Sequence, residues 1–385
     1  MPRLQVRTKA RPSEYVIRIG SGILSEVGNT ARAAFGKQAQ RVALISNQKV
    51  FSLYGSSVIK SLQASGFFVS RWLMGDGESH KSIRSLEKAL QFLSKNGLER
   101  GDGVIALGGG VVGDLAGFAA AIYLRGLPVI QVPTTLLSQI DSSIGGKTGV
   151  NIPTGKNLVG SFHQPRAVII DIETLSTLPA RELVAGWCEG VKQGAVGSQK
   201  LFKQTTNFLE MFNGQKVLVS PQLEKLIAAH CGFKASIVAA DEREDVTRRD
   251  HRSRRILNFG HTIAHALESV TGYRRFRHGE AVGHGMLVAG ALSKNLGLLD
   301  ASELQLLSQA VRLCGPLPAA SDLDENTIAD ALKQDKKRTG GHVQWVLLEK
   351  IGRPRMVDGK EIDSKLLKQS LRDGLGEDAM ATLRT

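Results

Sequence analysis

The first half of the chain alternates short apolar runs, rich in β-branched residues, with longer stretches that carry apolar residues at helical spacing. Six runs predict strands, at Tyr15–Ile19, Arg41–Ser46, Phe67–Leu73, Gly103–Leu107, Pro128–Val132 and Ala167–Asp171. Three stretches predict helices, at Val50–Ser65, Ser82–Asn96 and Asp114–Leu124. Ser82 suits an N-cap and Gly97 suits a helix end. Because strands joined through helices need crossover connections, this pattern predicts a mainly parallel sheet covered on both faces.

The second half carries longer helical patterns and few strand signals. After Leu178–Pro179, where Pro179 suits a first helical turn, the spacing predicts helices over 180–196, 222–240, 260–271, 280–297, 302–314 and 361–374. Only Val343–Leu348 has the pattern of a strand. We therefore expect an α/β N-terminal domain over residues 1–178 and an all-α C-terminal domain over residues 179–385. The cleft between two such domains is the expected active site.

Composition and charge narrow the class of ligand. Lys and Arg number 50 against 36 Asp and Glu, which leaves a formal net charge of +14 over 385 residues. Apolar residues make up 42% of the chain, enough for a substantial core, but aromatic residues make up only 5%. Few aromatics argue against a base-stacking surface, so the charge favours a cleft for an anionic small molecule over nucleic acid. A non-enzymatic anion- or nucleic-acid-binding protein stays open as an alternative.

The cysteines and the N-terminus bear on the compartment. Cys188, Cys231 and Cys314 are far apart and form no C-x-x-C pair, which excludes a disulfide scaffold and a cysteine-only zinc site. We expect reduced, buried thiols. The basic N-terminal dozen lacks the apolar region of a secretory signal, and no stretch approaches 18 uninterrupted apolar residues. The expectation is a soluble, cytoplasmic protein with no membrane partner.

A glycine-rich segment follows the predicted strand Gly103–Leu107. Gly108, Gly110 and Gly113 satisfy G-x-G-x-x-G between a strand and an apolar helix, where backbone amides approach a pyrophosphate. A sheet with such a turn is Rossmann-like. The usual acidic residue about twenty positions further on is missing, because Val132 leads into Pro133 and two threonines. The motif favours dinucleotide binding in a variant arrangement over a turn that merely packs tightly.

Histidines near residue 270 form the second signal. His261 and His265 lie four apart on one helical face, and His278 opens the next helix. Glu189 lies on an otherwise apolar helix, an expensive place for a carboxylate unless it is paired or binds metal. One histidine is usually structural, but three with a carboxylate favour a catalytic metal site.

Four lysines in glycine-rich or apolar settings form the third signal: Lys147, Lys156, Lys192 and Lys234. G-G-K-T at 145–148 is similar to the end of a P-loop, but the upstream spacing fails and no strand directly precedes it. A nucleoside triphosphatase is therefore rejected. The lysines favour an anion with several charged groups, such as a phosphorylated acid. The mixed-charge run Glu242–Arg255 reads as a solvated loop from which one arginine reaches the site.

Taken together, these segments resemble the 3-dehydroquinate synthases of the sugar phosphate cyclase family. The matching stretches are D-G-E-S-H-K (76–81), G-G-G-V-V-G-D-L-A-G-F (108–118), P-T-T-L-L-S-Q-I-D-S-S-I-G-G-K-T-G-V-N (133–151), G-K-N-L-V-G-S-F (155–162), E-G-V-K (189–192), K-A-S-I-V-A-A-D-E-R-E (234–244), L-N-F-G-H-T-I-A-H (257–265) and H-G-E (278–280). They span nearly the whole chain, and their combination is far more specific than any one of them.

The resemblance implies a carbon–oxygen lyase that uses NAD and zinc or cobalt, usually as a homodimer. Its substrate would be a phosphorylated sugar acid, 3-deoxy-D-arabino-heptulosonate 7-phosphate, which becomes 3-dehydroquinate and phosphate in the shikimate route to aromatic compounds. The implied sequence is transient oxidation by NAD, phosphate elimination, reduction, ring opening and aldol closure.

The resemblance also implies a role for each matched residue. The metal would be held by Glu189, His261 and His278, with His265 as a non-ligand group. NAD would be bound by Asn47, Asp76, Gly77, Glu78, Lys81, Gly109, Gly110, Val111, Gly113, Asp114, Thr134, Thr135, Asp141, Lys147, Lys156, Thr174, Leu175, Ser176 and Thr177. The substrate and its chemistry would be served by Arg125, Asp141, Lys147, Asn157, Lys192, Lys234, Glu244, Arg254, Asn258, His265 and Lys336, with Arg125 reaching across the dimer.

The chain departs from the family pattern in three places. The stretch before Ile256 is several residues longer, Ala264 replaces a glycine of the histidine motif, and Gln193 occurs where tyrosine is common. None of these removes a ligand or a cation. Two further enzymatic alternatives stay open, a cyclase acting on sedoheptulose 7-phosphate and a metal-dependent polyol dehydrogenase.

Overall fold

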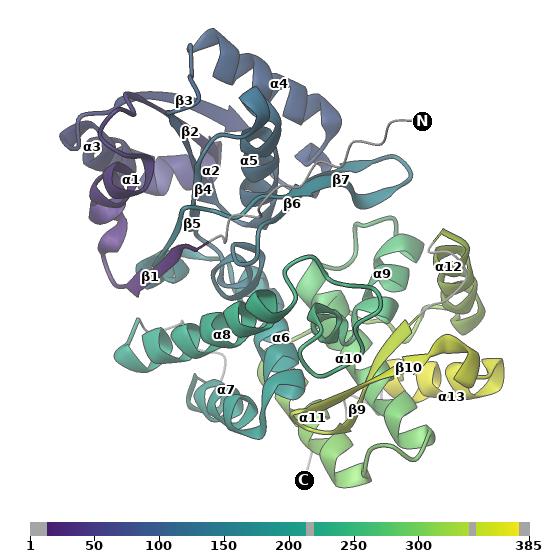
Figure 1. Cartoon of the computed structure of the whole chain (residues 1–385). Coiled ribbons are helices and arrows are strands. Elements are labelled where there is room, and N and C mark those ends of the chain that lie inside the picture. The colour runs from purple at the N-terminus through teal and green to yellow at the C-terminus, as the bar shows by residue number, and fades with distance from the viewer. Residues whose placement is uncertain (1–13, 213–218, 339–343, 377–385) are drawn as a thin grey trace, which may run out of the picture.

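The computed structural model describes residues 14–212, 219–338 and 344–376. Its N-terminal half is built on a six-stranded, fully parallel sheet with strand order β1-β8-β5-β4-β2-β3 (Figure 1). The strands are β1 (Val16–Gly20), β2 (Arg41–Asn47), β3 (Phe68–Met74), β4 (Gly103–Gly108), β5 (Val129–Pro133) and β8 (Ala167–Asp171). All six were predicted from the sequence, with ends that agree within one residue.

Alternating side chains of these strands build two core layers. Val42 and Leu44 of β2 pack on one face, against α1 (Val27–Phe35) and α3 (Ser56–Ala64). Ala43 and Ile45 pack on the other, against α4 (Ile83–Lys95) and α5 (Gly110–Ile122). Helices therefore cover both faces, as the pattern predicted. Both faces are buried, so the strands read as continuous apolar runs.

The predicted helices of this half are present, with some differences at their ends. The Ser82 hydroxyl accepts a hydrogen bond from the Ser85 amide, 3.3 Å away, which confirms the N-cap of α4. The stretch Val50–Ser65 is a short helix α2 (Gln48–Val50), a π-helical turn η2 (Phe51–Gly55) and α3. Helix α5 starts four residues before the predicted Asp114, because its first turn is made by the glycine-rich segment. Helix α1 was not predicted.

A two-stranded antiparallel hairpin, β6 (Lys147–Ile152) and β7 (Gly155–Phe162), projects beside the sheet toward the other half of the molecule (Figure 1). This hairpin was not predicted. Two of its glycines face each other across the ladder, and a Cβ on Gly160 would lie 2.2 Å from the Thr148 carbonyl oxygen. The strands are therefore closer than side chains at these positions would allow.

The second half is mostly helical, as predicted. Its helices are α6 (Ala180–Gly197), α7 (Gln199–Phe212), α8 (Pro221–Ala240), α9 (His261–Val270), α10 (His278–Asn295), α11 (Ala301–Leu313), α12 (Glu325–Arg338) and α13 (Ser364–Leu375), of which α7 and α12 were not predicted. The expected all-α domain with a single strand is wrong in one detail, because this half contains a two-stranded sheet. Strand β9 (Gln344–Lys350) pairs with an unpredicted strand β10 (Arg353–Asp358). Residue 343, where the expected strand began, lies outside the described residues.

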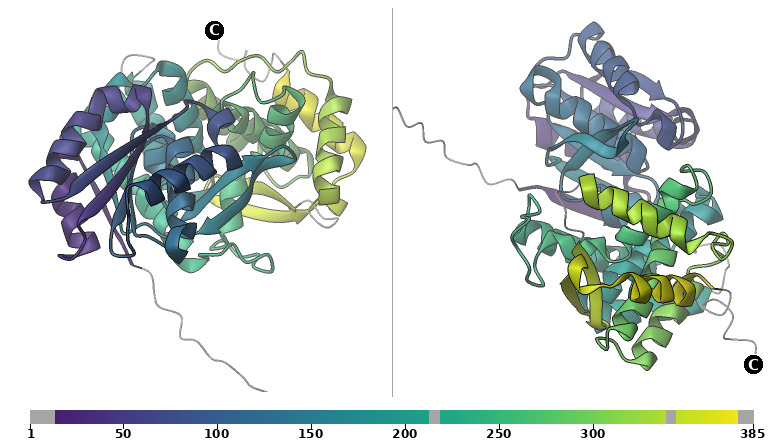
Figure 2. Two further views of the ribbon diagram at one scale, coloured as in Figure 1. Left: turned by 90° about the horizontal axis from the view of Figure 1, so that it is seen from above. Right: turned by 90° about the vertical axis from the view of Figure 1, so that its right-hand side faces the viewer.

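The two halves lie one above the other and share apolar packing (Figure 2). Val168 and Ile170 of β8 belong to the same buried cluster as Trp187 of α6 and Met286 of α10. All three cysteines are buried and free, as expected. None of the helices in the described part combines the length and apolar character needed to cross a bilayer. The basic N-terminal dozen lies outside the described residues.

Candidate active site

A large cavity lies at the carboxyl ends of β2 and β4, where the strand order reverses direction. In open parallel sheets this switch point is the usual ligand site. The cavity measures about 1370 Å³ and extends between the sheet and helices α6, α8, α9 and α10. It is therefore lined by both halves of the molecule, as the sequence predicted.

The glycine-rich turn forms the sheet side of this cleft. Gly109 is the N-cap of α5, and Gly109, Gly110 and Val111 line the cavity. A Cβ on Gly109 would lie 3.0 Å from Thr135 Cγ2, and one on Gly110 would lie 3.0 Å from Ser142 Oγ. The turn leaves the first amides of α5 accessible to an anion, so it fits the pyrophosphate of a dinucleotide.

Gly113 has a different surrounding. It does not line the cavity, and a Cβ there would lie 2.7 Å from Gln131 Oε1 on β5. The third glycine of the motif therefore allows α5 to pack closely on the sheet.

Polar side chains beside the turn are already linked to one another. Lys81, buried, forms an ion pair with Asp114 and donates a hydrogen bond to Asn157 Oδ1. Burial raises the pKa of Asp114, although Lys81 opposes this. Asn47 at the end of β2 donates to Asp76 Oδ1 at 2.9 Å. These residues, far apart in sequence, form one polar wall of the cleft.

Three predicted metal ligands converge on the helical side. Glu189 Oε1 of α6 lies 3.6 Å from His261 Nε2 of α9 and 3.5 Å from His278 Nε2 of α10. These separations are too long for hydrogen bonds. They match the separation of roughly 3.4 Å expected between ligands bound about 2.1 Å from a tetrahedral centre. The donor set and its spacing therefore fit a divalent metal such as zinc.

Each histidine has its second ring nitrogen occupied. His261 Nδ1 lies 3.2 Å from the Phe259 carbonyl oxygen, and His278 Nδ1 lies 3.5 Å from Glu268 Oε1. The Phe259 carbonyl oxygen accepts the His261 Nδ1 proton, and the Glu268 carboxylate attracts a proton to His278 Nδ1, which leaves both Nε2 lone pairs for a metal. Burial, with Lys192 nearby, holds the pKa of His261 well below its usual value and favours the neutral ligand form.

The Glu189 carboxylate is 1% exposed, and its Oε2 pairs with Lys192 Nζ at 2.5 Å. Within the described residues its Oε1 has no hydrogen-bond partner. One oxygen of this buried carboxylate faces two imidazoles and accepts no hydrogen bond from them. A bound cation between the three groups would supply the missing partner.

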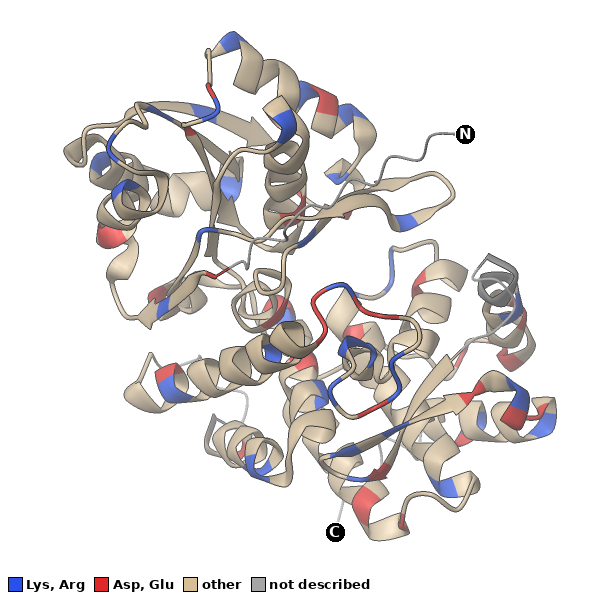
Figure 3. Cartoon of the chain, viewed as in Figure 1, with Lys and Arg blue, Asp and Glu red and all other residues tan. Residues whose placement is uncertain are grey.

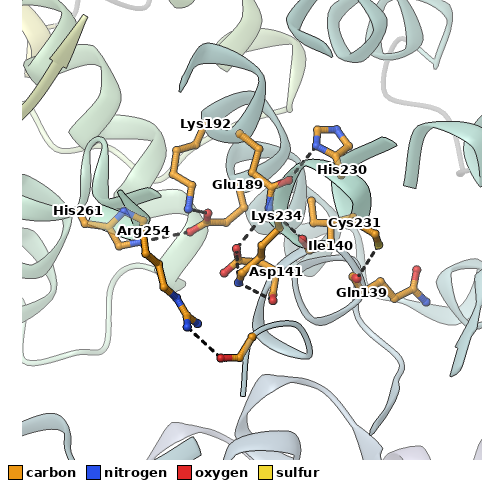
Figure 4. Close-up of polar contacts among 12 residues, drawn as sticks. Gln139, Ile140, Asp141, Glu189, Lys192, His230, Cys231, Lys234, Arg254 and His261 are labelled. Atoms are coloured by element: carbon orange, nitrogen blue, oxygen red, sulfur yellow. Dashed lines mark hydrogen bonds and ion pairs between the residues drawn. The ribbon is translucent and has the colours of Figure 1, made fainter. Parts of the chain in front are cut away.

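Buried cations surround the floor of the cleft (Figure 4). Lys192, Lys234 and Arg254 are each less than 7% exposed and all line the cavity. Lys234 Nζ donates to Asp141 Oδ1 at 2.7 Å. Burial alone would raise the pKa of Asp141, but Lys234 and Lys192 hold it well below its usual range. Three cations against two carboxylates, Glu189 among them, leave a net attraction for an anion.

A second cationic group lies at the hairpin. Lys147, half-exposed at the start of β6, pairs with Glu244, whose other oxygen accepts from Asn258 Nδ2 at 3.0 Å. Burial would raise the pKa of Glu244, but Lys147 lowers it below its usual value. Arg254, at the end of the charged loop, donates to the Gly145 and Glu242 carbonyl oxygens at 2.9 and 2.7 Å. The expectation that one arginine of this loop reaches the site agrees with this geometry.

The structure brings most of the predicted residues to one cavity. Its lining includes Asn47, Asp76, Gly77, Glu78, Lys81, Gly109, Gly110, Val111, Asp114, Thr134, Thr135, Asp141, Lys147, Lys156, Asn157, Thr174, Thr177, Lys192, Lys234, Arg254, Asn258, His261, His265 and His278. Glu189 and Glu244 do not line it, but they form ion pairs with Lys192 and Lys147, which do. Arg125, Gly113, Leu175 and Ser176 do not line it. The side chain of Lys336, on α12, lies outside the described residues.

Two buried residues of the site were not predicted. Glu268, 1% exposed, contacts His278 and accepts from Lys156 Nζ at 2.9 Å, so it joins α9 and α10 to the hairpin. Its spacing of three from His265 and seven from His261 places it on the histidine face of α9, a signal that was available in the sequence. Gln193, 0% exposed, has no such signal, because its partners come from distant segments.

Comparison with known proteins covers nearly the whole chain. The family profile described as 3-dehydroquinate synthase N-terminal matches residues 71–185, and the C-terminal profile matches residues 186–338. A curated 3-dehydroquinate synthase of Cyanothece sp. is 43% identical over 348 residues, 89% of this chain and 92% of that protein. That of Nostoc punctiforme is 42% identical over 360 residues, 93% of this chain and 96% of that protein.

Solved structures share the fold. A 2-epi-5-epi-valiolone synthase from Streptomyces hygroscopicus, with NAD⁺ and Zn²⁺ bound, superposes with a TM-score of 0.85 at 24% identity, covering 95% of this chain and 98% of that one. A 2-deoxy-scyllo-inosose synthase complexed with carbaglucose-6-phosphate, NAD⁺ and Co²⁺ superposes with a TM-score of 0.78 at 26% identity, covering 93% and 96%.

Proposed function

The chain belongs to the 3-dehydroquinate synthase family, and we propose that it converts 3-deoxy-D-arabino-heptulosonate 7-phosphate into 3-dehydroquinate and phosphate. One observation carries the proposal. A single cleft combines a dinucleotide turn, a Glu-His-His set and a cluster of buried cations. Phosphate leaves carbon in an elimination, so the enzyme is a carbon–oxygen lyase.

The cofactors are NAD and a divalent metal, zinc or cobalt, as in the structural neighbours. Glu189, His261 and His278 would hold the metal, and the turn at Gly109–Val111 would hold the pyrophosphate of NAD. When bound, NAD takes up and returns a hydride and the metal acts as a Lewis acid, which makes the C–H beside the phosphate-bearing carbon acidic.

The protein's own contribution is electrostatic. Burial alone would lower the pKa of Lys192, but Glu189 and Asp141 raise it above the usual lysine value, so this ammonium stays charged in the cleft. Lys192, Lys234, Arg254 and Lys147 are placed to hold the phosphate and carboxylate of the substrate. Fixed cations stabilise the charge that develops on phosphate as its C–O bond breaks. We propose that the departing phosphate itself takes the proton from the neighbouring carbon.

The remaining lining residues orient the substrate and exclude water. His265 lies beside the metal histidines, with its ring centroid 5.8 Å from that of His261 and 6.1 Å from that of His278. With Asn258 and Asn157 it is placed to hydrogen-bond the hydroxyls of the substrate. Holding a flexible seven-carbon chain in one pose lowers the barrier to its closure.

Phosphate release and NADH absorbance, measured together on the metal-loaded enzyme, test the proposal. The expected result is stoichiometric phosphate and 3-dehydroquinate with no net NADH. Net NADH on turnover would instead identify a polyol dehydrogenase. Phosphate release from sedoheptulose 7-phosphate, but not from the heptulosonate phosphate, would identify another sugar phosphate cyclase.

We also propose a homodimer that acts in the cytosol. Arg125, matched to a substrate-binding position, does not line the cleft of its own chain. It lies in a turn where Leu124 and Arg125 have φ angles of 49° and 68°. An arginine on the outside of one chain serves a substrate if it reaches the cleft of a second copy. Mixing inactive Arg125→Ala chains with inactive Lys192→Ala chains should then restore about a quarter of wild-type activity, because half of a random mixture is heterodimer with one intact site.

A further inference from the structure

A π-helical turn on the floor of the cleft is held by side chains from two helices. In this turn, η5 (Ser138–Ser142), three successive carbonyl oxygens each accept a hydrogen bond from a side chain (Figure 4). Cys231 Sγ of α8 donates to Gln139 O at 3.4 Å, Gln193 Nε2 of α6 donates to Ile140 O at 2.9 Å, and Lys234 Nζ of α8 donates to Asp141 O at 2.5 Å. The turn is thus fixed from outside.

Gln193 is the central member of this set, and its orientation is determined by its partners. Its Nε2 faces the Ile140 carbonyl oxygen and lies 3.3 Å from Asp141 Oδ1. Both are acceptors, so this end of the amide must be the nitrogen. The Oε1 end then faces His230 Nδ1 at 3.1 Å and requires a proton on that nitrogen.

His230 is 0% exposed, and burial lowers its pKa to about 3, so the ring is neutral. A neutral ring with its proton on Nδ1 has a lone pair on Nε2. That nitrogen lies 3.1 Å from the Thr205 hydroxyl, whose single proton is also directed at the Leu201 carbonyl oxygen 2.8 Å away. The tautomer of His230 is therefore set by Gln193, whose amide is in turn oriented by the Ile140 carbonyl oxygen of the turn.

The turn controls a cation of the cleft. Asp141 Oδ1 receives both Gln193 Nε2 and Lys234 Nζ, and Lys234 lines the cavity. We propose that Gln193 and His230 are positioning residues, which fix the Ile140–Asp141 backbone and thereby hold the Lys234 ammonium where it binds the anionic groups of the substrate. This inference deepens the proposed function and, for its kinetic test, rests on it.

Matched substitutions at His230 separate positioning from packing. His230→Leu removes the donor to Gln193, whereas His230→Asn places an amide N–H near the position of Nδ1. Gln193→Leu removes the bonds to the turn directly. Val196→Ala, a buried change on α6 without a bond to the turn, is the control for lost packing.

For the holoenzyme, His230→Leu and Gln193→Leu should raise the KM for the heptulosonate phosphate about tenfold. They should weaken the binding of inorganic phosphate, measured by calorimetry, by a similar factor. His230→Asn should stay within about threefold of wild type in both. Val196→Ala should lower the melting temperature without changing either constant. Phosphate binding that stays within twofold of wild type in both leucine variants would overturn the proposal.

The wild-type chain supplies a test that needs neither turnover nor substitution. Histidine-selective ¹⁵N NMR should show His230 as the neutral Nδ1–H tautomer between pH 6 and 8. The Nε2–H tautomer would contradict the hydrogen bonding on which the inference depends. If the holoenzyme releases no phosphate from its substrate, the proposed function fails, and the tautomer and phosphate binding still decide the role of Gln193 and His230.

Discussion

The side chain of Lys147 is half-exposed, whereas those of Lys192 and Lys234 are buried. It begins β6, pairs with Glu244 and lines the cleft. A fixed cation near a leaving phosphate contributes on the order of 100-fold or more to the rate. Lys147→Ala should therefore lower phosphate release at least 100-fold. Lys60→Ala, an exposed change on α3 outside the cleft, is the control. Activity within a few-fold of wild type would remove Lys147 from the mechanism.

A substitution of Glu189 tests the proposed metal site while both histidines stay unchanged. Replacing it with glutamine keeps its size but removes the negative charge that faces both imidazoles. Glu189→Gln should therefore purify with much less than one zinc or cobalt per chain, whereas wild type should hold about one. Elemental analysis of dialysed protein measures this. Gln193→Leu, one turn further along the same helix, should keep its metal, and a fully loaded Glu189→Gln chain would show that the metal lies elsewhere.

Some residues of the site could be predicted from the sequence and others could not, for a physical reason. Glu189 was identified because a carboxylate in an apolar helix needs a partner, and His261 and His278 because of spacing. Gln193 and His230 carry no charge and occur in apolar helices as ordinary polar residues. Their function depends on which loop packs against them, and that is decided by the tertiary fold.

At the scale of elements, one aspartate links the segments that follow two neighbouring strands, β1 and β8. Asp171, at the end of β8, accepts from the amides of Gly22, Leu24 and Glu173, each at 3.0 Å. It is 2% exposed, and its removal leaves the buried Leu24 amide without its acceptor and breaks two further hydrogen bonds. Asp171→Ala should lower the free energy of unfolding by about 3 kcal/mol in urea titrations. Glu173→Ala, a neighbouring exposed carboxylate, should cost less than about 1 kcal/mol, and equal losses would contradict this account.

Lys156, near the tip of the hairpin, is one of the side chains that tie the hairpin to the helical half. Lys156 Nζ donates to Glu268 at 2.9 Å and lies 4.6 Å from the ring centroid of Tyr273. Lys156→Met keeps a side chain of similar length but removes the ion pair with Glu268 and the cation–π contact with Tyr273. Hydrogen exchange in residues 153–158 should become at least several-fold faster, while exchange in α4 should not change. Unchanged exchange in the hairpin would show that its own ladder is sufficient.

The elements that were predicted and those that were missed differ in burial. The six sheet strands are continuous apolar runs because helices cover both of their faces. The β6–β7 hairpin is rich in glycine and polar residues, since one side of it lines the cleft. Helix α12 has a low apolar content, and among its described side chains (325–333) only Ile328, Ala329 and Leu332 are buried. The hairpin and α12 were both missed because the predictions depended on apolar periodicity. The domain boundary near residue 178 stays a prediction.

At the scale of the whole molecule, the net charge of +14 is spread rather than gathered on one face. Figure 3 shows Lys and Arg on nearly every element, interspersed with Asp and Glu, including the loop between α8 and α9. Under the proposed function, the substrate is bound by the small set of buried cations in the cleft. The preference for an anionic small molecule over nucleic acid stays a prediction.

The proposed metal ligands also connect the helical half, because Glu189, His261 and His278 come from α6, α9 and α10. A ligand that binds only the folded state adds stability in proportion to the logarithm of its occupancy, about 2.7 kcal/mol at 100 times its dissociation constant. Removing the metal with a chelator should therefore abolish turnover and lower the melting temperature by roughly 5 °C. Zinc or cobalt should restore both. Glu189→Gln, already short of metal, should show no further shift with chelator, which separates loss of the bound ion from a general effect of the reagent. A metal-free chain that keeps full activity and its original melting temperature would exclude the Glu-His-His set from both roles.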